Sequence, residues 1–230
     1  MTRGQAEAQE KGETMTTTIK RVGVLGSGDV GQTLAKGLKA HGYEVRIGSR
    51  SPAKLEAFVT ETKIPSGTFS AVAAWGEALV LSVLGRAAAE ALMEALPQNL
   101  AGKPVLDTTN PIGDEPPEDG VIRYFTGANR SLMEDLQATF PQAHLVKAFN
   151  SVGSNLMVNP KFREKPTMFY CGNNAAAKAF AARVIEQFGW EGADMGTAVA
   201  ARAIEPLAQL WCIRGFRENQ WTHAFRLLRL

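Results

Sequence analysis

Two short polar segments of this chain could bind a ligand, and each stands directly after an apolar run. The sequence GSGDVG occupies positions 26–31 after the apolar run 22–25, and GSRS occupies positions 48–51 after the apolar run 43–47. Three glycines in a G-x-G-x-x-G spacing, between a strand and a helix, are typical of the loop that holds the pyrophosphate of a dinucleotide. The first segment therefore predicts dinucleotide binding.

The three glycines of the first segment have different physical roles. Gly26 permits a tight turn from strand to helix, and Gly28 lets the backbone approach the pyrophosphate without a Cβ in the way. Gly31 allows the following helix to pack closely, with its N-terminus facing the anion. The spacing thus predicts a phosphate cradle.

The second segment indicates which dinucleotide binds. An NAD site places Asp or Glu about 20 residues after the glycines, against the ribose 2′-hydroxyl, but Ser49, Arg50 and Ser51 stand here instead. A 2′-phosphate would be repelled by a carboxylate and bound by a guanidinium, by hydroxyls and by the ammonium of Lys54. NADP(H) is therefore expected rather than NAD(H). The alternative is that Arg50 and Lys54 are ordinary solvated charges.

The elements that must position these segments alternate between short apolar strands and helices. We predict strands at 19–25, 43–47, 78–84, 105–107, 145–149 and 167–171, and helices at 30–41, 87–96 and 175–188. A further helix is predicted to begin with Ser51 as N-cap and Pro52 at the first helical position. This order predicts an α/β fold with a doubly wound parallel sheet, a Rossmann NAD(P)-binding fold, whose ligands bind beyond the carboxyl ends of the strands.

We expect three parts along the chain. Residues 1–18 are polar, lack an apolar signal stretch and are predicted to be a disordered tail, with Met15 as a possible alternative start. Residues 19–150 are predicted to form the Rossmann dinucleotide-binding domain. Residues 151–230 are predicted to form a small C-terminal α/β annex packed on it.

Composition argues against several function classes. The 25 Lys and Arg residues and 23 Asp and Glu residues are scattered, so neither nucleic acid nor an anionic membrane is indicated as a partner. No apolar run approaches the roughly 20 residues of a membrane span, and we expect a cytoplasmic protein. Cys171 and Cys212 are predicted to be buried thiols. The histidines, at positions 41, 144 and 223, have no metal-ligand spacing, so no metal is expected.

The strand ends carry a resemblance to a known family. The segments LGSGDVG, IGSR, LVLSVL, VLDTTNP, VKAFN and FYCGN resemble the F420-dependent NADP oxidoreductases, and they are also similar to the cytosolic reductase domain of the six-transmembrane metalloreductases. The resemblance covers essentially everything after Thr18. It implies direct hydride transfer between NADP(H) and a tricyclic flavin-like ring, for which no protein acid or base is obligatory, so no catalytic side chain is expected.

The same resemblance implies roles for individual residues. The pyrophosphate loop would consist of Ser27, Gly28, Asp29 and Val30, and the 2′-phosphate would be bound by Ser49, Arg50 and Lys54. The nicotinamide side of the pocket would be lined by Ser82, Val83, Leu84, Asn110 and Ala148. One departure is that Gly85-Arg86 follow Leu84, where the archaeal members resemble one another in having a bulkier segment.

Two related enzyme classes offer a rival interpretation. The β-hydroxyacid dehydrogenases and imine reductases carry a Lys and an Asn on one helix face, and Lys147 and Asn150 superficially match that pair. The run 145–149 reads as a strand, on which these side chains would point to opposite faces. We therefore expect a structural or cofactor-edge role for Lys147. Asp107, at a strand end, is expected to orient Thr108 and Thr109 and to bond a ribose or the backbone.

Two function classes remain. The first is an oxidoreductase that passes hydride between NADP(H) and coenzyme F420 or a flavin such as FMN or FAD. The alternative is a non-catalytic NADP(H)-binding sensor or scaffold protein, because fold alone does not decide activity. A C-terminal apolar set is predicted to pack in the core, with part of it facing a partner subunit in a homodimer; it comprises Leu207, Leu210, Trp211, Phe216, Trp221, Phe225 and Leu228.

Overall fold

The structure, a computed structural model, describes residues 19–230. The predicted disordered tail, residues 1–18, lies outside the described residues. The strands are β1 (Arg21–Leu25), β2 (Glu44–Gly48), β3 (Ser66–Gly67), β4 (Ala78–Leu81), β5 (Pro104–Asp107), β6 (His144–Lys147), β7 (Thr167–Gly172) and β8 (Glu191–Asp194). The helices are α1 (Asp29–Ala40), α2 (Glu56–Thr62), α3 (Phe69–Trp75), α4 (Ala88–Glu94), α5 (Pro97–Leu100), α6 (Leu132–Thr139), α7 (Ala175–Gln187), α8 (Ala201–Ile204) and α9 (Pro206–Glu218).

The strands form one sheet in the order β3-β2-β1-β4-β5-β6-β7-β8. The neighbouring pairs from β3 to β6 are parallel, which confirms the predicted Rossmann fold. At the far edge the prediction of parallel pairing is wrong, because β7 is antiparallel to β6 and only β8 is parallel to β7. A parallel neighbour requires a long crossover, usually a helix, whereas residues 148–166 contain only a short 3-10 turn.

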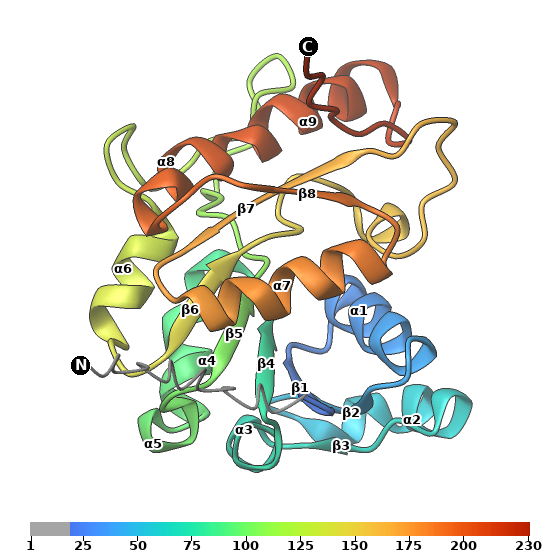
Figure 1. The fold of residues 1–230 in the computed structure, drawn as a ribbon, viewed down its shortest axis with the longest axis vertical. Coiled ribbons are helices and arrows are strands. Elements are labelled where there is room, and N and C mark those ends of the chain that lie inside the picture. The colour runs from blue at the N-terminus through green and yellow to red at the C-terminus, as the bar shows by residue number, and fades with distance from the viewer. Residues whose placement is uncertain (1–18) are drawn as a thin grey trace, which may run out of the picture.

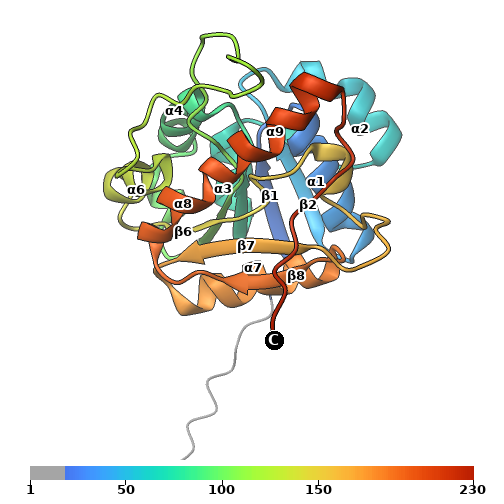
Figure 2. The same ribbon diagram turned by 90° about the horizontal axis from the view of Figure 1, so that it is seen from above.

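Helices cover both faces of this sheet (Figure 1). Side chains alternate between the faces along each strand, so Val22 and Val24 of β1 pack with α1, α2 and α7, whereas Leu79 and Leu81 of β4 pack with α3, α4 and α6. The two hydrophobic cores hold the parallel strands between them. Figure 2 shows α8 and α9 passing over one end of the sheet.

Several predicted elements differ at their ends. The predicted strands 78–84 and 145–149 stop at Leu81 and Lys147, since the following residues turn to form loops. Ser51 and Pro52 occupy the predicted N-cap and first position, but of a 3-10 turn that precedes α2, and the Ser51 side chain makes no capping bond. The last helix, α9, ends where Asn219 adopts a left-handed φ of 52°, so His223 lies beyond it.

The C-terminal apolar set is only partly in the core. Trp211 is buried, but Leu210, Phe216 and Leu228 expose more than half of their surface. Over residues 19–230, no helix combines the length and apolar character needed to cross a bilayer.

Candidate functional site

A cleft of about 860 Å³ opens at the carboxyl ends of β1, β2, β4 and β5. The strand order reverses between β1 and β4, and ligands of doubly wound sheets bind at such a switch point. All predicted site residues except Gly31 and Ala148 line this cleft; they are Gly26, Ser27, Gly28, Asp29, Val30, Ser49, Arg50, Ser51, Lys54, Ser82, Val83, Leu84 and Asn110. Most of the residues predicted from the sequence therefore line the same cleft.

The glycines shape the loop between β1 and α1. Gly26 has a φ of 140°, which L side chains rarely adopt, and a Cβ there would collide with the carbonyl oxygen of Ser82. A Cβ at Gly31 would collide with the carbonyl oxygen of Gly26. Gly28, in contrast, has open space where its Cβ would stand. The loop therefore packs closely against the rest of the protein at Gly26 and Gly31 and leaves free space for a ligand at Gly28.

The N-terminus of α1 lies at this open loop. Gly28 is the N-cap residue and provides no side-chain capping bond, so the first-turn N–H groups are available to a ligand in the cleft. Gln32 Nε2 donates to the carbonyl oxygen of Ser27 at 2.9 Å and holds the loop. Free N–H groups and the helix dipole favour an anion here, so these residues fit a pyrophosphate.

Ser49 joins the glycine loop to the end of β2. Its side chain is buried, and its Oγ accepts hydrogen bonds from Ser27 Oγ at 3.3 Å and from the Ser51 N–H at 3.1 Å. Because Ser49 accepts both bonds, its own hydroxyl proton remains available to a ligand oxygen. Lys54, from the 3-10 turn before α2, lines the same end of the cleft.

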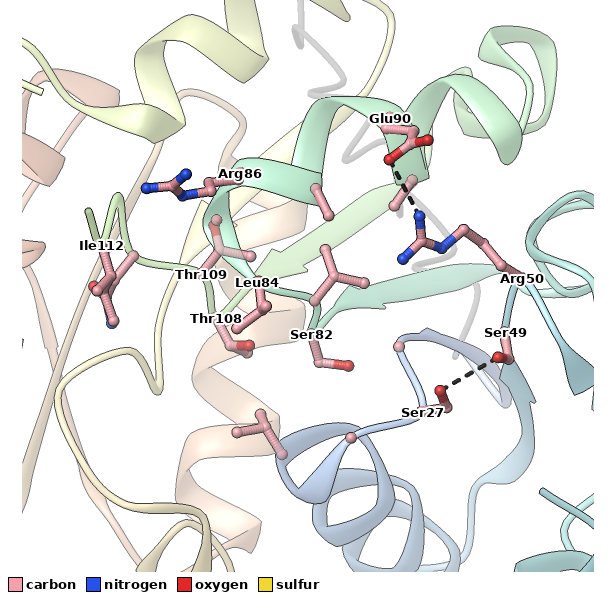
Figure 3. A pocket seen from close by; sticks show the side chains of 18 of the residues that line it. Ser27, Ser49, Arg50, Ser82, Leu84, Arg86, Glu90, Thr108, Thr109 and Ile112 are labelled. Atoms are coloured by element: carbon pink, nitrogen blue, oxygen red, sulfur yellow. Dashed lines mark hydrogen bonds and ion pairs between the residues drawn. The ribbon is translucent and has the colours of Figure 1, made fainter. Parts of the chain in front are cut away.

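Arg50 extends across this end of the cleft. Its Nη1 lies 3.4 Å from Glu90 Oε2 on α4, and both side chains are more than half exposed (Figure 3). The cations of Arg50 and Lys54 and the hydroxyls of the neighbouring serines therefore surround the end of β2, which is the composition expected for a phosphate-binding end. Glu90 adds a carboxylate that the sequence prediction did not include.

The opposite end of the cleft is more apolar. Leu84 is 80% exposed although it is a large apolar side chain, and Ile112 is 42% exposed. Gly85 packs against the backbone of Asn110, because a Cβ there would collide with the Asn110 carbonyl oxygen. Next to this contact, Arg86 Nη1 donates to Asp114 Oδ2. An apolar surface thus lies between two charged ends of one cleft.

Lys147 lies behind the cleft wall and not in it. It is 0% exposed, and its Nζ lies 2.7 Å from Asp107 Oδ2, 3.0 Å from Glu205 Oε1 and 2.7 Å from the Thr109 carbonyl oxygen. Burial opposes the charged form, but the two carboxylates outweigh it and hold the pKa of Lys147 above its usual value. The structural role expected for Lys147 is confirmed.

Asp107 orients only one of the two threonines. Its Oδ1 accepts from the N–H of Thr109 at 2.9 Å and from Thr109 Oγ1 at 2.7 Å. Thr108 Oγ1 instead donates to the Leu81 carbonyl oxygen at 3.0 Å. Of the two bonds expected for Asp107, the structure has the one to the backbone, from the Thr109 N–H; its carboxylate is fully buried against Lys147 and cannot reach a ribose.

The segment after β6 supports the cleft from behind. Asn110 Nδ2 donates to the Asn150 carbonyl oxygen at 2.7 Å, and Asn150 Nδ2 donates to Asn110 Oδ1 at 3.0 Å. Asn150 lies beyond the strand, after Phe149 with its left-handed φ of 59°, so the predicted placement on a strand face is wrong. Ala148 is fully buried in the core, and the expectation that its side chain lines the nicotinamide side is also wrong.

Sequence reasoning missed several lining residues. Thr108 and Thr109 directly follow β5, and that position beyond a strand end is a signal that could have placed them in the cleft. The others lie on α3, the 3-10 turn before α4, α4 and the loop after β5, where no local pattern marks a site; they are Phe69, Gly85, Arg86, Ala87, Glu90, Ala91, Ile112, Gly113 and Asp114.

The cysteines lie away from this cleft. Cys171 is buried as predicted, whereas Cys212 is only partly buried. Burial raises the pKa of Cys171 to about 12 and that of Cys212 to about 11, so neither thiol is activated. Within residues 19–230, no three His, Cys, Asp or Glu side chains cluster as metal ligands.

The chain is similar to known redox proteins. Residues 21–111 match the family described as "NADP oxidoreductase coenzyme F420-dependent". A protein of Arthrobacter sp. FB24, provisionally described as an F420-dependent NADP reductase, is 31% identical, with a TM-score of 0.84 over 92% of this chain and 100% of that one. The metalloreductase STEAP3 of Rattus norvegicus is 28% identical over 188 residues, which are 81% of this chain and 36% of that protein.

These similarities differ in what they establish. The chain spans about a third of the length of the curated metalloreductases that it matches. The imine reductase of Aspergillus terreus, at 19% identity and a TM-score of 0.64 over 87% of this chain and 63% of that one, shares the fold alone. The Arthrobacter protein, in contrast, is covered along its whole length, and the family match runs from the start of β1 to Pro111 in the loop after β5. The chain therefore belongs to the coenzyme F420-dependent NADP oxidoreductase family.

Proposed function

We propose that this protein transfers hydride between NADP(H) and coenzyme F420 or a flavin. The observation that carries this proposal is one cleft with a phosphate-binding end and an exposed apolar surface beyond it. Gly28 leaves the first end open, and Leu84 and Ile112 provide the second. A dinucleotide and a second planar ring fit such an arrangement, because rings bind on apolar surfaces that are bordered by a few polar groups.

The residues of the cleft have separate tasks in this proposal. The N-terminus of α1 binds the pyrophosphate, and Ser49, Arg50 and Lys54 bind the 2′-phosphate. Asn110, held by Asn150, and Thr109, held by Asp107, keep the polar wall fixed. Polar groups that are already fixed in place orient a bound nicotinamide without a further reorganisation free energy at the moment of reaction.

The apolar side chains have the remaining task. Val83, Leu84 and Ile112 exclude water from the space where the two rings would meet. NADPH supplies a hydride, which is one proton and two electrons, and leaves as NADP⁺, while the acceptor ring gains the hydride and takes a second proton from solvent. No ionisable side chain is required to donate or accept the transferred hydride.

The test is an acceptor series with purified protein. NADPH is incubated with F420, FMN, FAD or a ferric chelate, and its absorbance band is followed. The proposal expects oxidation of NADPH with at least one ring acceptor. Binding of NADPH without oxidation by any acceptor would overturn the proposal and favour the non-catalytic sensor. Oxidation of NADPH with the ferric chelate alone would show that the protein is a reductase but that its acceptor is not a planar ring.

A further inference from the structure

We propose that the far end of the cleft selects ring acceptors that carry a phosphate or another anionic group on their side chain, and that Arg86 binds this anion. The inference rests on the proposed function, since it concerns the acceptor of that reaction. It is carried by the position of Arg86 relative to the exposed apolar side chains and to the other cations of the cleft.

The apolar part of the cleft is the first observation. Leu84 is exposed inside a concave surface, and in Figure 3 it lies between Ser82 and Ile112. Large apolar side chains exposed in a cleft mark a surface that binds a partner or a ligand. A planar ring placed over Leu84 and Ile112 would reach past them towards the turn that follows β4.

The distribution of positive charge is the second observation. Figure 3 shows Arg50 and Arg86 at opposite ends of the cleft, with Leu84 between them. Lys54 belongs to the turn that follows β2 and lines the cleft with Arg50. One bound dinucleotide uses Arg50 and Lys54 for its 2′-phosphate. Arg86 is left for the anion of a second ligand, because it lies across the apolar surface from Arg50.

The state of the Arg86 side chain supports this use. It donates to Asp114 through Nη1, and the two side chains are 45% and 79% exposed. An exposed pair of this kind contributes roughly 0 to 1 kcal/mol to stability. The guanidinium carries five N–H donors in a fork that matches phosphate oxygens. A phosphate can therefore compete with Asp114 for Arg86.

The backbone fixes Arg86 relative to the apolar surface. Gly85 packs against the backbone of Asn110. The neighbouring loop is held by the N–H of Gly113, which donates to the Arg123 carbonyl oxygen at 2.7 Å, and by the bridge between Ile112 and Tyr124. The apolar surface and the guanidinium of Arg86 thus belong to two loops that pack against each other. This packing holds them in fixed relative positions before a ligand binds, which favours selective binding.

The test compares matched ligands in the presence of NADP⁺. The dissociation constants of FMN and riboflavin, and of F420 and the same deazaflavin without its phosphate-bearing tail, are measured from ligand fluorescence. Arg86→Ala is expected to weaken binding of FMN and F420 about tenfold and to leave the tail-free rings within about twofold. Asp114→Asn, which removes the competing carboxylate, is expected to strengthen binding of the anionic ligands only.

Arg123→Ala is the matched control. Arg123 bonds to Glu118 on the same loop, is similarly exposed and does not line the cleft, so its loss should change none of the four constants. Equal effects of Arg86→Ala on tailed and tail-free rings, or no effect on either, would overturn the inference while the proposed function stands. If the wild-type protein binds none of the four rings, the ring acceptor itself is wrong and the inference fails with it.

Discussion

Lys147 and Glu205 form a buried ion pair that connects the end of β6 to the junction of α8 and α9, with Nζ 3.0 Å from Oε1. The same carboxylate accepts the N–H groups of Leu132 and Met133 in the first turn of α6, at 2.9 and 3.0 Å. With Asp107, two carboxylates face one ammonium, and the N-terminus of α6 stabilises the second negative charge. One cluster thus joins β5, β6, α6 and α8 behind the wall of the cleft.

This cluster predicts the effect of Lys147→Met on stability. The substitution leaves Asp107 and Glu205 buried without their ammonium, which should lower the free energy of unfolding by about 3–5 kcal/mol. Urea unfolding checks this value. The control is Lys36→Met, which removes an exposed pair with Glu61 at 3.0 Å and should cost less than about 1 kcal/mol. Similar losses for the two variants would contradict the proposed importance of burial.

The contact between Arg50 and Glu90 predicts a gain of cofactor affinity. Glu90 competes with a 2′-phosphate for Arg50 and repels it, so Glu90→Gln should strengthen NADPH binding about two- to fivefold. NADH has no 2′-phosphate and its affinity should not change. Isothermal titration measures both constants. Glu94→Gln, on the same helix but outside the cleft, is the control. Weaker NADPH binding by Glu90→Gln would show that Glu90 helps to position Arg50 instead.

The capping box of α6 predicts a dependence of stability on pH. Hydrogen bonds from Arg202, with further bonds from Ser131, hold the pKa of Glu134 below its usual value of 4.5. A carboxyl with a lowered folded pKa contributes stability that is present above 4.5 and is lost as pH falls through the folded pKa.

Glu134→Gln tests that contribution. It should lower the free energy of unfolding by about 0.5–1 kcal/mol at neutral pH and by progressively less as the pH falls through the lowered pKa of Glu134, where the wild-type carboxyl becomes protonated. Urea unfolding at several pH values gives the difference. A difference between wild type and variant that stays constant over this range would rule out the charged form of Glu134 as its source.

Local sequence patterns predicted the part of the site that depends on backbone geometry. Gly26, Gly28 and Gly31 were predictable because a tight turn, an open approach and a close helix contact each require glycine, and the structure has those three environments at these positions. The start of α6 was also readable, since Ser131 and Glu134 have the spacing of a capping box, although the prediction left it out.

Long-range contacts account for most of what sequence reasoning missed. Glu90 lies on α4, 40 residues after its partner Arg50, and Arg86 meets Asp114 only because two loops pack at Gly85. The family resemblance implied Ala148 for the nicotinamide side of the cleft, but Ala148 is fully buried in the core, next to the turn at Phe149. Such contacts depend on how the elements pack, which local sequence patterns do not encode.

The central claim is that the cleft holds the 2′-phosphate of NADP(H) at Arg50, and one titration tests it most directly. Dissociation constants for NADPH and NADH are measured for the wild type, for Arg50→Ala and for Arg214→Ala. Arg214 is a similarly exposed arginine, paired with Glu218 on α9 and outside the cleft. The wild type and Arg214→Ala should bind NADPH more tightly than NADH, and Arg50→Ala should weaken NADPH binding about tenfold without changing NADH binding. Unchanged NADPH affinity in Arg50→Ala would contradict the account.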